Sequence, residues 1–321
     1  MNTTRILSYL CLAGAVCACS DETAEEQPTT TTTPPTVSNL PGAMQKVARE
    51  EGFVLSAVLD AYRPLAATKT DAPTYPKRFP RVLVNLLRSW ESMVSSDCVE
   101  MTPYVDEDAD GIPATFTATF DCAQAADGGR TITVTGSIDI SDASDAEEGA
   151  ARDGFDIVFR ELRTGKLLPA VAGEGLASRR LEHARVINGK VAVRSVESRL
   201  FEANVSSILA LRHEDDTGIL GQSLTWLAGQ YDTDASASDP MDVGWLEYHA
   251  VGSATWLDET WMLWRETDPT LRWRRQCREL YPGVSGFSAG ALVVHDDAGN
   301  LLRLEHGGCR RVVVTYNGDT L

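Results

Sequence analysis

Two spacings of hydrophobic positions divide the chain. Between residues 41 and 97, apolar side chains recur three or four residues apart, first around Val47, Val54 and Val58 and then from Leu83 to Val94. This spacing places them on one face of a helix and is typical of a face that packs on a core. The sequence therefore predicts two helices within residues 42–95, separated by a proline-containing segment.

From Cys98 onward the spacing changes to two. Phe116, Ala118 and Phe120 alternate with threonines, and the same alternation returns along most of the remaining chain. Such alternation is typical of antiparallel strands with one buried and one wetted face. It predicts nine to twelve strands, a hairpin turn at Asn188-Gly189, and three closing strands, of which the first two are joined by the turn Asp296–Asn300.

The predicted fold class is mainly β (α+β). Two N-terminal helices pack on a large curved antiparallel sheet or half-barrel, because the helices precede the strands and no alternating strand–helix rhythm is present. Residues 41–321 are interpreted as a single globular domain, with helices in 42–95 and antiparallel β structure in 98–321.

The first eighteen residues have the features of an export signal. Arg5 precedes an apolar run from Ile6 to Ala18, which is too short for a membrane span of ~20 residues. The run ends in Val16-Cys17-Ala18-Cys19, which resembles the lipobox of bacterial lipoproteins. That resemblance implies cleavage before Cys19, acylation of its thiol with fatty chains such as palmitate, and anchoring to the outer membrane, facing the periplasm or the cell surface.

Composition changes the picture at two points. Residues 19–40 contain five consecutive threonines, three prolines and several acids, so they are predicted to be a disordered linker between the lipid and the domain. The formal net charge of −17 argues against a nucleic-acid partner, because the overall field repels a polyanion.

Four cysteines remain after the signal peptide and Cys19. An even number in an exported chain indicates two disulfides, for which three connectivities are possible. The pairs Cys98–Cys122 and Cys277–Cys309 are favoured, because each closes a local segment.

One acidic motif and one serine motif suggest chemistry. Asp106, Asp108, Asp110 and the carbonyl of Ile112 resemble the start of a calcium-binding loop, although the ligands that would complete an EF-hand are missing; the alternative is a solvated turn. Ser288 lies in a GxSxG sequence, but a strand-like segment follows where a hydrolase would have a helix.

Tryptophans and arginines gather between residues 226 and 278, where they indicate either an aromatic core seam or a binding surface. The partner of such a surface would be an anionic lipid, a glycan or an envelope protein. The candidate binding residues are Trp256, Trp261, Trp264, Arg265, Arg272, Trp273 and Arg274.

The DxDxDGIP segment and the closing Gly307-Gly308-Cys309 to Gly318 stretch are similar to uncharacterised bacterial envelope lipoproteins. The sequence therefore predicts a lipid-anchored envelope lipoprotein without catalytic residues, which binds a ligand or an envelope partner. The alternative function is an envelope hydrolase that uses Ser288. The only cofactor suggested is Ca²⁺.

Overall fold

The structure is a computed structural model, and it describes residues 39–61, 83, 96–105, 112–142, 154–171, 173–195, 202–215, 218–237, 242–280 and 286–321. Its helices are α1 (Leu40–Ala61) and α3 (Arg275–Leu280), with single 3-10 turns at η2 (Ser96–Cys98), η3 (Asp127–Gly129) and η4 (Leu176–Ser178). The strands of the first part are β1 (Val99–Met101), β2 (Thr115–Ala125), β3 (Thr131–Asp142), β4 (Gly154–Leu167), β5 (Leu181–Ser195), β6 (Glu202–Asp215), β7 (Gly218–Thr233), β8 (Val243–Trp256) and β9 (Glu259–Thr267). The strands of the second part are β10 (Leu271–Arg274), β11 (Phe287–Ala289), β12 (Ala291–Asp296), β13 (Leu301–His306), β14 (Val312–Tyr316) and β15 (Asp319–Thr320).

All the described strands belong to one antiparallel sheet of 15 strands. From β1 to β9 each strand pairs with the next one in the chain, and β9 then pairs with β12, which continues through β13 and β14 to β15. The short strands β10 and β11 leave this path, since β10 pairs with the free part of β8 and with β11. The mainly β fold class is therefore confirmed.

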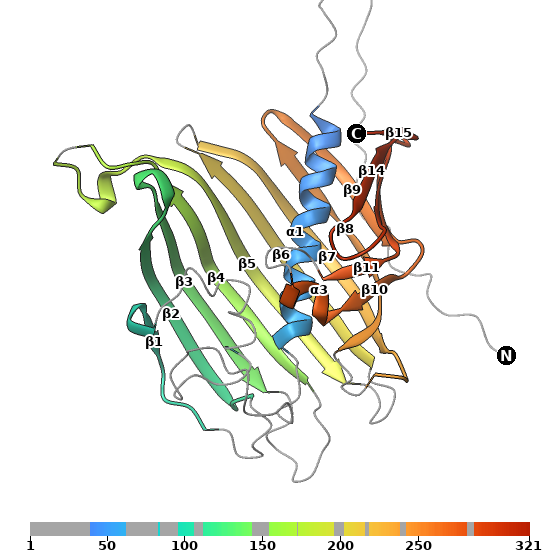
Figure 1. The fold of residues 1–321 in the computed structure, drawn as a ribbon, viewed down its shortest axis with the longest axis horizontal. Helices are drawn as coiled ribbons and strands as arrows, with labels where there is room; N and C mark the ends of the chain where they lie inside the picture. Colours follow the sequence, from blue (N-terminus) through green and yellow to red (C-terminus); the bar gives the residue numbers. More distant parts are fainter. Residues whose placement is uncertain are drawn as a thin grey trace, which may run out of the picture. The chain divides into compact units, whose positions relative to one another are not determined.

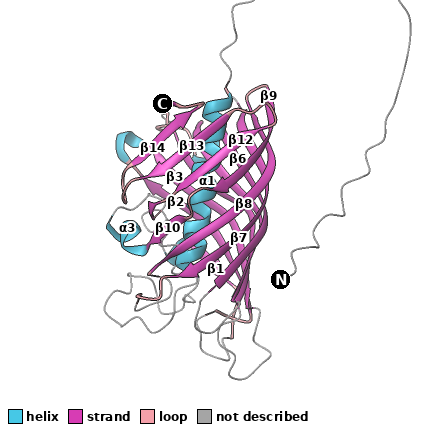
Figure 2. Cartoon of the chain, turned by 90° about the vertical axis from the view of Figure 1, so that its right-hand side faces the viewer, coloured by secondary structure: helices cyan, strands magenta, loops and turns pink. Residues whose placement is uncertain are grey.

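Helix α1 lies along the inner face of the curved sheet (Figures 1 and 2). Its predicted apolar residues, Val47, Val54 and Val58, are buried in one core together with residues from β2 to β14. Strand alternation supplies the other side of this core, where Phe116, Phe155 and other inward side chains are excluded from water. Each fully buried side chain of this size contributes about 1.5–3 kcal/mol, so the core accounts for the position of α1.

The second predicted helix lies outside the described residues except for Leu83, which is helical and belongs to the buried core. The turn predicted at Asp296–Asn300 is confirmed, because it joins β12 to β13 and Asp296 accepts two hydrogen bonds from Asn300. The three predicted closing strands are confirmed as β12, β13 and β14.

The hairpin predicted at Asn188-Gly189 is wrong. Both residues lie in the middle of the continuous strand β5, where Asn188 pairs with Ala210 of β6 and Gly189 pairs with Phe159 of β4. The irregularity is in the neighbouring strand, since the register shifts between Phe159 and Leu162 of β4. Extended pairing on both sides of β5 outweighed the local preference of Asn-Gly for a turn.

The expected number of strands was also too low. Fifteen strands are assigned where nine to twelve were predicted, because β1, β11 and β15 contain only two or three residues each. Segments this short cannot show a period of two.

Both predicted disulfides are confirmed. Cys98 and Cys122 join the start of β1 to β2, and Cys277 and Cys309 join α3 to the segment after β13. Each bond closes a loop of moderate length and contributes about 3–4 kcal/mol by restricting the unfolded chain.

Candidate ligand-binding cavity beside helix α1

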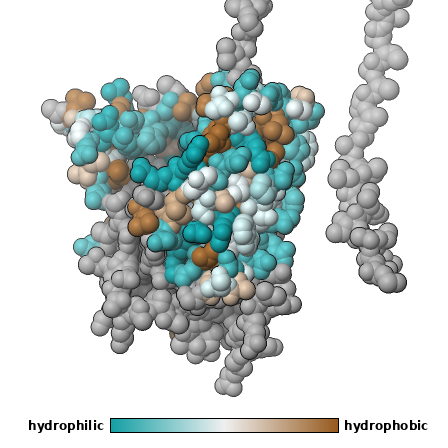
Figure 3. All heavy atoms as spheres, turned by 45° about the vertical axis from the view of Figure 1, so that its right-hand side comes forward, coloured by the Kyte–Doolittle hydropathy of each residue, from teal (hydrophilic) through white to brown (hydrophobic). Residues whose placement is uncertain are grey.

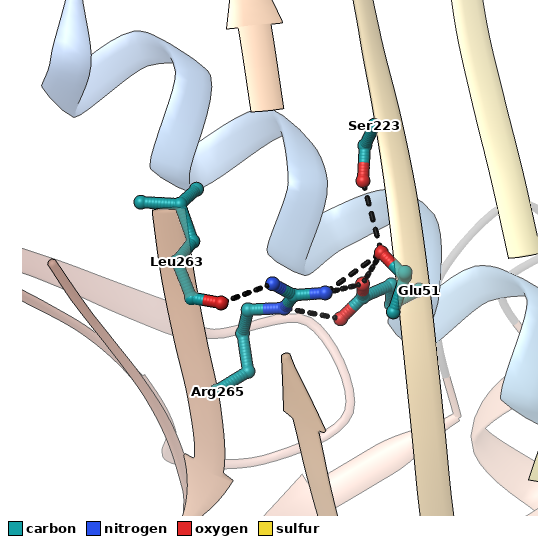
Figure 4. A network of polar contacts seen from close by, with 5 residues as sticks. Glu51, Ser223, Leu263 and Arg265 are labelled. Carbon is teal, nitrogen blue, oxygen red and sulfur yellow. Dashed lines mark hydrogen bonds and ion pairs between the residues drawn. The ribbon is translucent and has the colours of Figure 1, made fainter. Parts of the chain in front are cut away.

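Helix α1 is fixed to the sheet by a buried ion pair (Figure 4). Glu51 of α1 receives hydrogen bonds from Arg265 of β9, from Nε at 3.1 Å and from Nη2 at 2.6 Å, and both side chains are excluded from water. The remaining donors of Arg265 bond to the Leu263 carbonyl and to Thr225, both at 2.7 Å. Thr225 in turn donates to Glu51 and lies 3.0 Å from the Ser223 hydroxyl. The charges are thus paired as well as hydrogen-bonded, as burial requires.

A second charged cluster surrounds Glu50, the neighbouring residue of α1. Its nearly buried carboxylate lies 2.5 Å from Arg185 Nε of β5, 3.2 Å from Lys46 Nζ and 3.7 Å from His213 Nε2 of β6. Burial, together with the positive charge of Lys46, lowers the pKa of His213 to about 4, although the nearby Glu50 opposes the shift. His213 is therefore neutral at pH 7, and Glu50 is neutralised by Arg185 and Lys46.

Beside these two acidic residues, a cavity of about 380 Å³ opens between α1, β8 and the short strands β10 to β13. Its volume falls in the usual range of small-molecule sites. The apolar wall consists of Leu271, Phe287, Leu292 and Leu304, which all point to the inner face of the sheet. The cavity is thus an extension of the core, and no described side chain fills it.

A single phenol lies within this apolar wall. Tyr248 of β8 is fully buried, and its hydroxyl has no hydrogen-bond partner among the described residues. Burial raises the pKa of Tyr248, and the nearby Glu51 charge raises it further, so the group stays a neutral donor. A buried hydroxyl without a partner costs about 1–3 kcal/mol, which favours a ligand that accepts its hydrogen bond.

The mouth of the cavity is basic, although the chain as a whole carries −17. Among the described residues that line it, four are cations and one, Glu50, is an anion. The cations are Lys46, Arg49, Arg185 and Arg310. Burial lowers the pKa of His306, which also lines the cavity, to about 4, so it adds no charge at pH 7. The excess of positive charge at this one place attracts an anionic group.

The seven candidate binding residues do not form one surface. Arg265 and Trp273 are buried on the inner face, whereas Trp264 of the same strand as Arg265 points outward and stacks on His295 at 5.7 Å. Like Arg265 and Trp273, Trp256 and Trp261 point inward, since they pair across the sheet with the buried residues Gly221 and Ala254 respectively. Arg272 and Arg274 share the outer face. Arg272 lies over the Trp245 ring at 5.1 Å and bonds to Asp234, and Arg274 is exposed.

The calcium motif lies largely outside the described residues. Asp106, Asp108 and Asp110 are not described, and Ile112 is buried in the core. Within the part of the chain that the structure describes, no group of three acidic, histidine or cysteine side chains is arranged to hold a metal ion.

Ser288 lies on the short strand β11, and its hydroxyl donates to the Arg272 carbonyl at 3.3 Å. Strand β12 begins three residues later, so the chain does not form the strand–turn–helix of a nucleophile elbow. Along β11, Phe287 faces His306 at a ring distance of 5.7 Å, whereas Ser288 is the next residue and points to the opposite face.

Sequence reasoning missed the residues that build the cavity. Glu51 could have been found, because Met44, Val47, Glu51, Val54 and Val58 follow one another at steps of three and four and place a carboxylate on the buried face of α1. Tyr248 alternates with other apolar residues along β8, which indicates a buried face, but its role in a cavity depends on the distant strands β10 to β13.

Cys19 and the signal segment lie outside the described residues. No described helix is long and apolar enough to cross a membrane. Comparisons of the chain with protein-family models, with curated protein sequences and with solved structures found no match.

Proposed function

We propose that the protein is a lipid-anchored lipoprotein of the bacterial envelope that binds a small anionic amphiphile in the cavity beside α1, without catalysing a reaction. The observation that carries the binding proposal is the combination of an apolar wall with a basic mouth in one cavity of about 380 Å³. The anchor is supported by the lipobox-like sequence that ends at Cys19.

The two ends of the cavity match the two ends of such a ligand. An alkyl chain would contact Leu271, Phe287 and Leu304, and it would gain the ~25 cal/mol that each Å² of apolar surface contributes on burial. A phosphate or carboxylate head group would lie near Arg49 and Arg310 at the mouth, where charge-assisted hydrogen bonds are stronger than neutral ones.

Binding of three surfactants with the same alkyl chain tests this proposal. Dodecyl phosphate, dodecyl maltoside and dodecyltrimethylammonium are titrated by calorimetry below their micellar concentrations. We expect dodecyl phosphate to bind at least tenfold more tightly than the other two, since only its head group is anionic. Equal affinity for all three head groups would contradict the proposal.

Matched arginine variants locate the site. Arg49→Gln and Arg310→Gln remove cations of the mouth, so each is expected to weaken dodecyl phosphate binding. Arg303→Gln is the control, because Arg303 lies on β13 but alternates to the outer face between the inward Leu302 and Leu304. If Arg303→Gln weakens binding as much as the other two, the ligand does not occupy this cavity.

The anchor has a separate test. Mass spectrometry of the native protein is expected to find an acylated N-terminal Cys19, and Cys19→Ala is expected to release the chain from the membrane fraction. An intact Met1, or an N-terminus without lipid, would refute the anchor and leave the surfactant result standing.

A further inference from the structure

The outer face of β7, β8 and β9 carries large apolar side chains where strand alternation normally places polar ones. Leu224 and Trp226 of β7 are 55% and 53% exposed, and Met262 of β9 is 44% exposed. Val251 and Trp264 lie among them and are partly exposed. These five residues are named the outer apolar patch. Grouped exposed apolar residues of this size mark an interaction site rather than a scattered surface.

Strand register makes the patch continuous. Trp226 pairs with Val251, which pairs with Trp264, so the three side chains form one row across three strands. In the next row, Leu224 and Met262 lie on either side of Ser253. Side chains directly opposite each other in such pairs are ~5 Å apart, so the two rows form one surface.

The surroundings of the patch favour a neutral apolar partner. Between the patch and the β8–β9 turn lies a row of uncharged polar residues, Gln222, Thr255 and Thr260. On its other side the outer face carries His249, which pairs with Glu266 and lies 3.8 Å from Glu247. No lysine or arginine lies in these rows on β7, β8 or β9, so the patch has no strong means to attract a polyanion, and its two indole rings suit a lipid interface.

The described chain begins at the same end of the sheet. The backbone N–H of Asn39, just before α1, donates to Glu259 at the start of β9 at 2.8 Å. Figures 1 and 2 both place the start of α1 beside the β8–β9 turn, and Figure 3 shows hydrophobic groups among the polar ones near this end. Leu257 in that turn is 50% exposed. Met262 of the patch follows Glu259 by three residues along β9, which is about 10 Å at 3.3 Å per residue.

We propose that the outer apolar patch docks on the surface of the bilayer that holds the Cys19 anchor, with the Trp226 and Trp264 rings at the level of the lipid head groups. This inference rests on the proposed anchor. The segment from Ser20 to Ser38 spans at most roughly 65 Å when fully extended, so the anchor keeps the patch close to the bilayer. At the resulting high effective concentration, a patch with weak intrinsic affinity is occupied.

The test uses the acylated full-length protein in vesicles of phosphatidylcholine and phosphatidylethanolamine, with brominated phosphatidylcholine as the quencher of tryptophan fluorescence. We expect brominated lipid to quench part of the fluorescence. Trp226→Phe is expected to remove roughly half of that quenching, because two exposed indoles share the interface. Trp245→Phe is the control, since Trp245 is also on the outer face of β8 but lies beside Arg272 at the other end of the strand.

A second variant separates contact from anchoring. Leu224→Asp combined with Met262→Asp places charges in the patch and is expected to abolish the bromine-dependent quenching, while the protein still floats with the vesicles and still binds dodecyl phosphate. Quenching that is absent in the native protein, or unchanged in both patch variants, overturns the docking proposal. The docking proposal is also overturned, in favour of a protein partner, if another protein co-purifies with the native chain but not with the Leu224→Asp/Met262→Asp variant while the quenching is unchanged.

Failure of the proposed anchor can be distinguished from failure of the proposed docking. If the purified protein carries no lipid at Cys19 and does not float with vesicles, the anchor and this inference both fall. If it carries the lipid and floats but shows no quenching, only the docking of the patch falls.

Discussion

Replacing Arg265 by methionine tests whether the buried ion pair holds α1 on the sheet. The substitution keeps an unbranched side chain of similar length but removes four hydrogen bonds, two to Glu51, one to Thr225 and one to the Leu263 carbonyl. Glu51 would then be a carboxylate that is excluded from water, and among the described residues it would retain only the Thr225 hydroxyl as a donor.

The expected loss is about 3–5 kcal/mol in the free energy of unfolding, which is the usual cost of removing one partner of a buried pair. Against a total stability of roughly 5–15 kcal/mol, this is a large fraction. The double variant Glu51→Leu/Arg265→Met removes both charges, so it is expected to recover most of that loss, because no uncompensated charge remains. The coupling between the two sites is thus expected to exceed 2 kcal/mol, within the usual range for residues in contact.

Urea unfolding followed by tryptophan fluorescence measures these differences with the disulfides intact. Arg160→Met is the matched control, because Arg160 pairs with Asp139 at 2.5 Å but its side chain is 64% exposed, and such surface pairs contribute about 0–1 kcal/mol. The reasoning is refuted if Arg265→Met costs no more than Arg160→Met, or if the double variant loses as much as the single variants Arg265→Met and Glu51→Leu together.

Three further outcomes are expected. Replacing Cys98 and Cys122 by alanine removes one disulfide and is expected to cost about 3–4 kcal/mol in urea unfolding; an unchanged midpoint would contradict this. The pKa values of His213 and His306 are lowered to about 4 in the folded protein, so the unfolded chain binds protons more readily between pH 4 and about 6.5. Tm is therefore expected to fall as the pH drops through this window. It is expected to fall less in the variant in which both histidines are glutamine. Tyr248→Phe removes a buried hydroxyl that has no partner among the described residues, so it is expected not to lower Tm; a lower Tm would show that the hydroxyl is paired in the free protein.

Local patterns predicted much of the fold. Alternation along residues such as Phe116 to Phe120 determines which side of a strand is buried, and the step of three or four from Val47 to Val58 determines the buried face of α1. The even number of cysteines and their separation along the chain were sufficient to predict both disulfides. The Asn188-Gly189 turn failed for the opposite reason, since pairing with two neighbouring strands decided the conformation of β5.

The candidate site depended on contacts between distant parts of the chain. Arg265 and Glu51 are 214 residues apart, so the ion pair that holds α1 could not be read from either local pattern. The tryptophan and arginine cluster was visible in the sequence, but the twofold alternation of a strand sends neighbouring residues to opposite faces. Sequence alone therefore determined most of the longer strands, the buried face of α1 and the disulfides, because these depend on local periodicity and on the number and spacing of the cysteines. Only the tertiary structure decided the cavity and the outer apolar patch, because both arise where sheet curvature and strand register bring remote residues together.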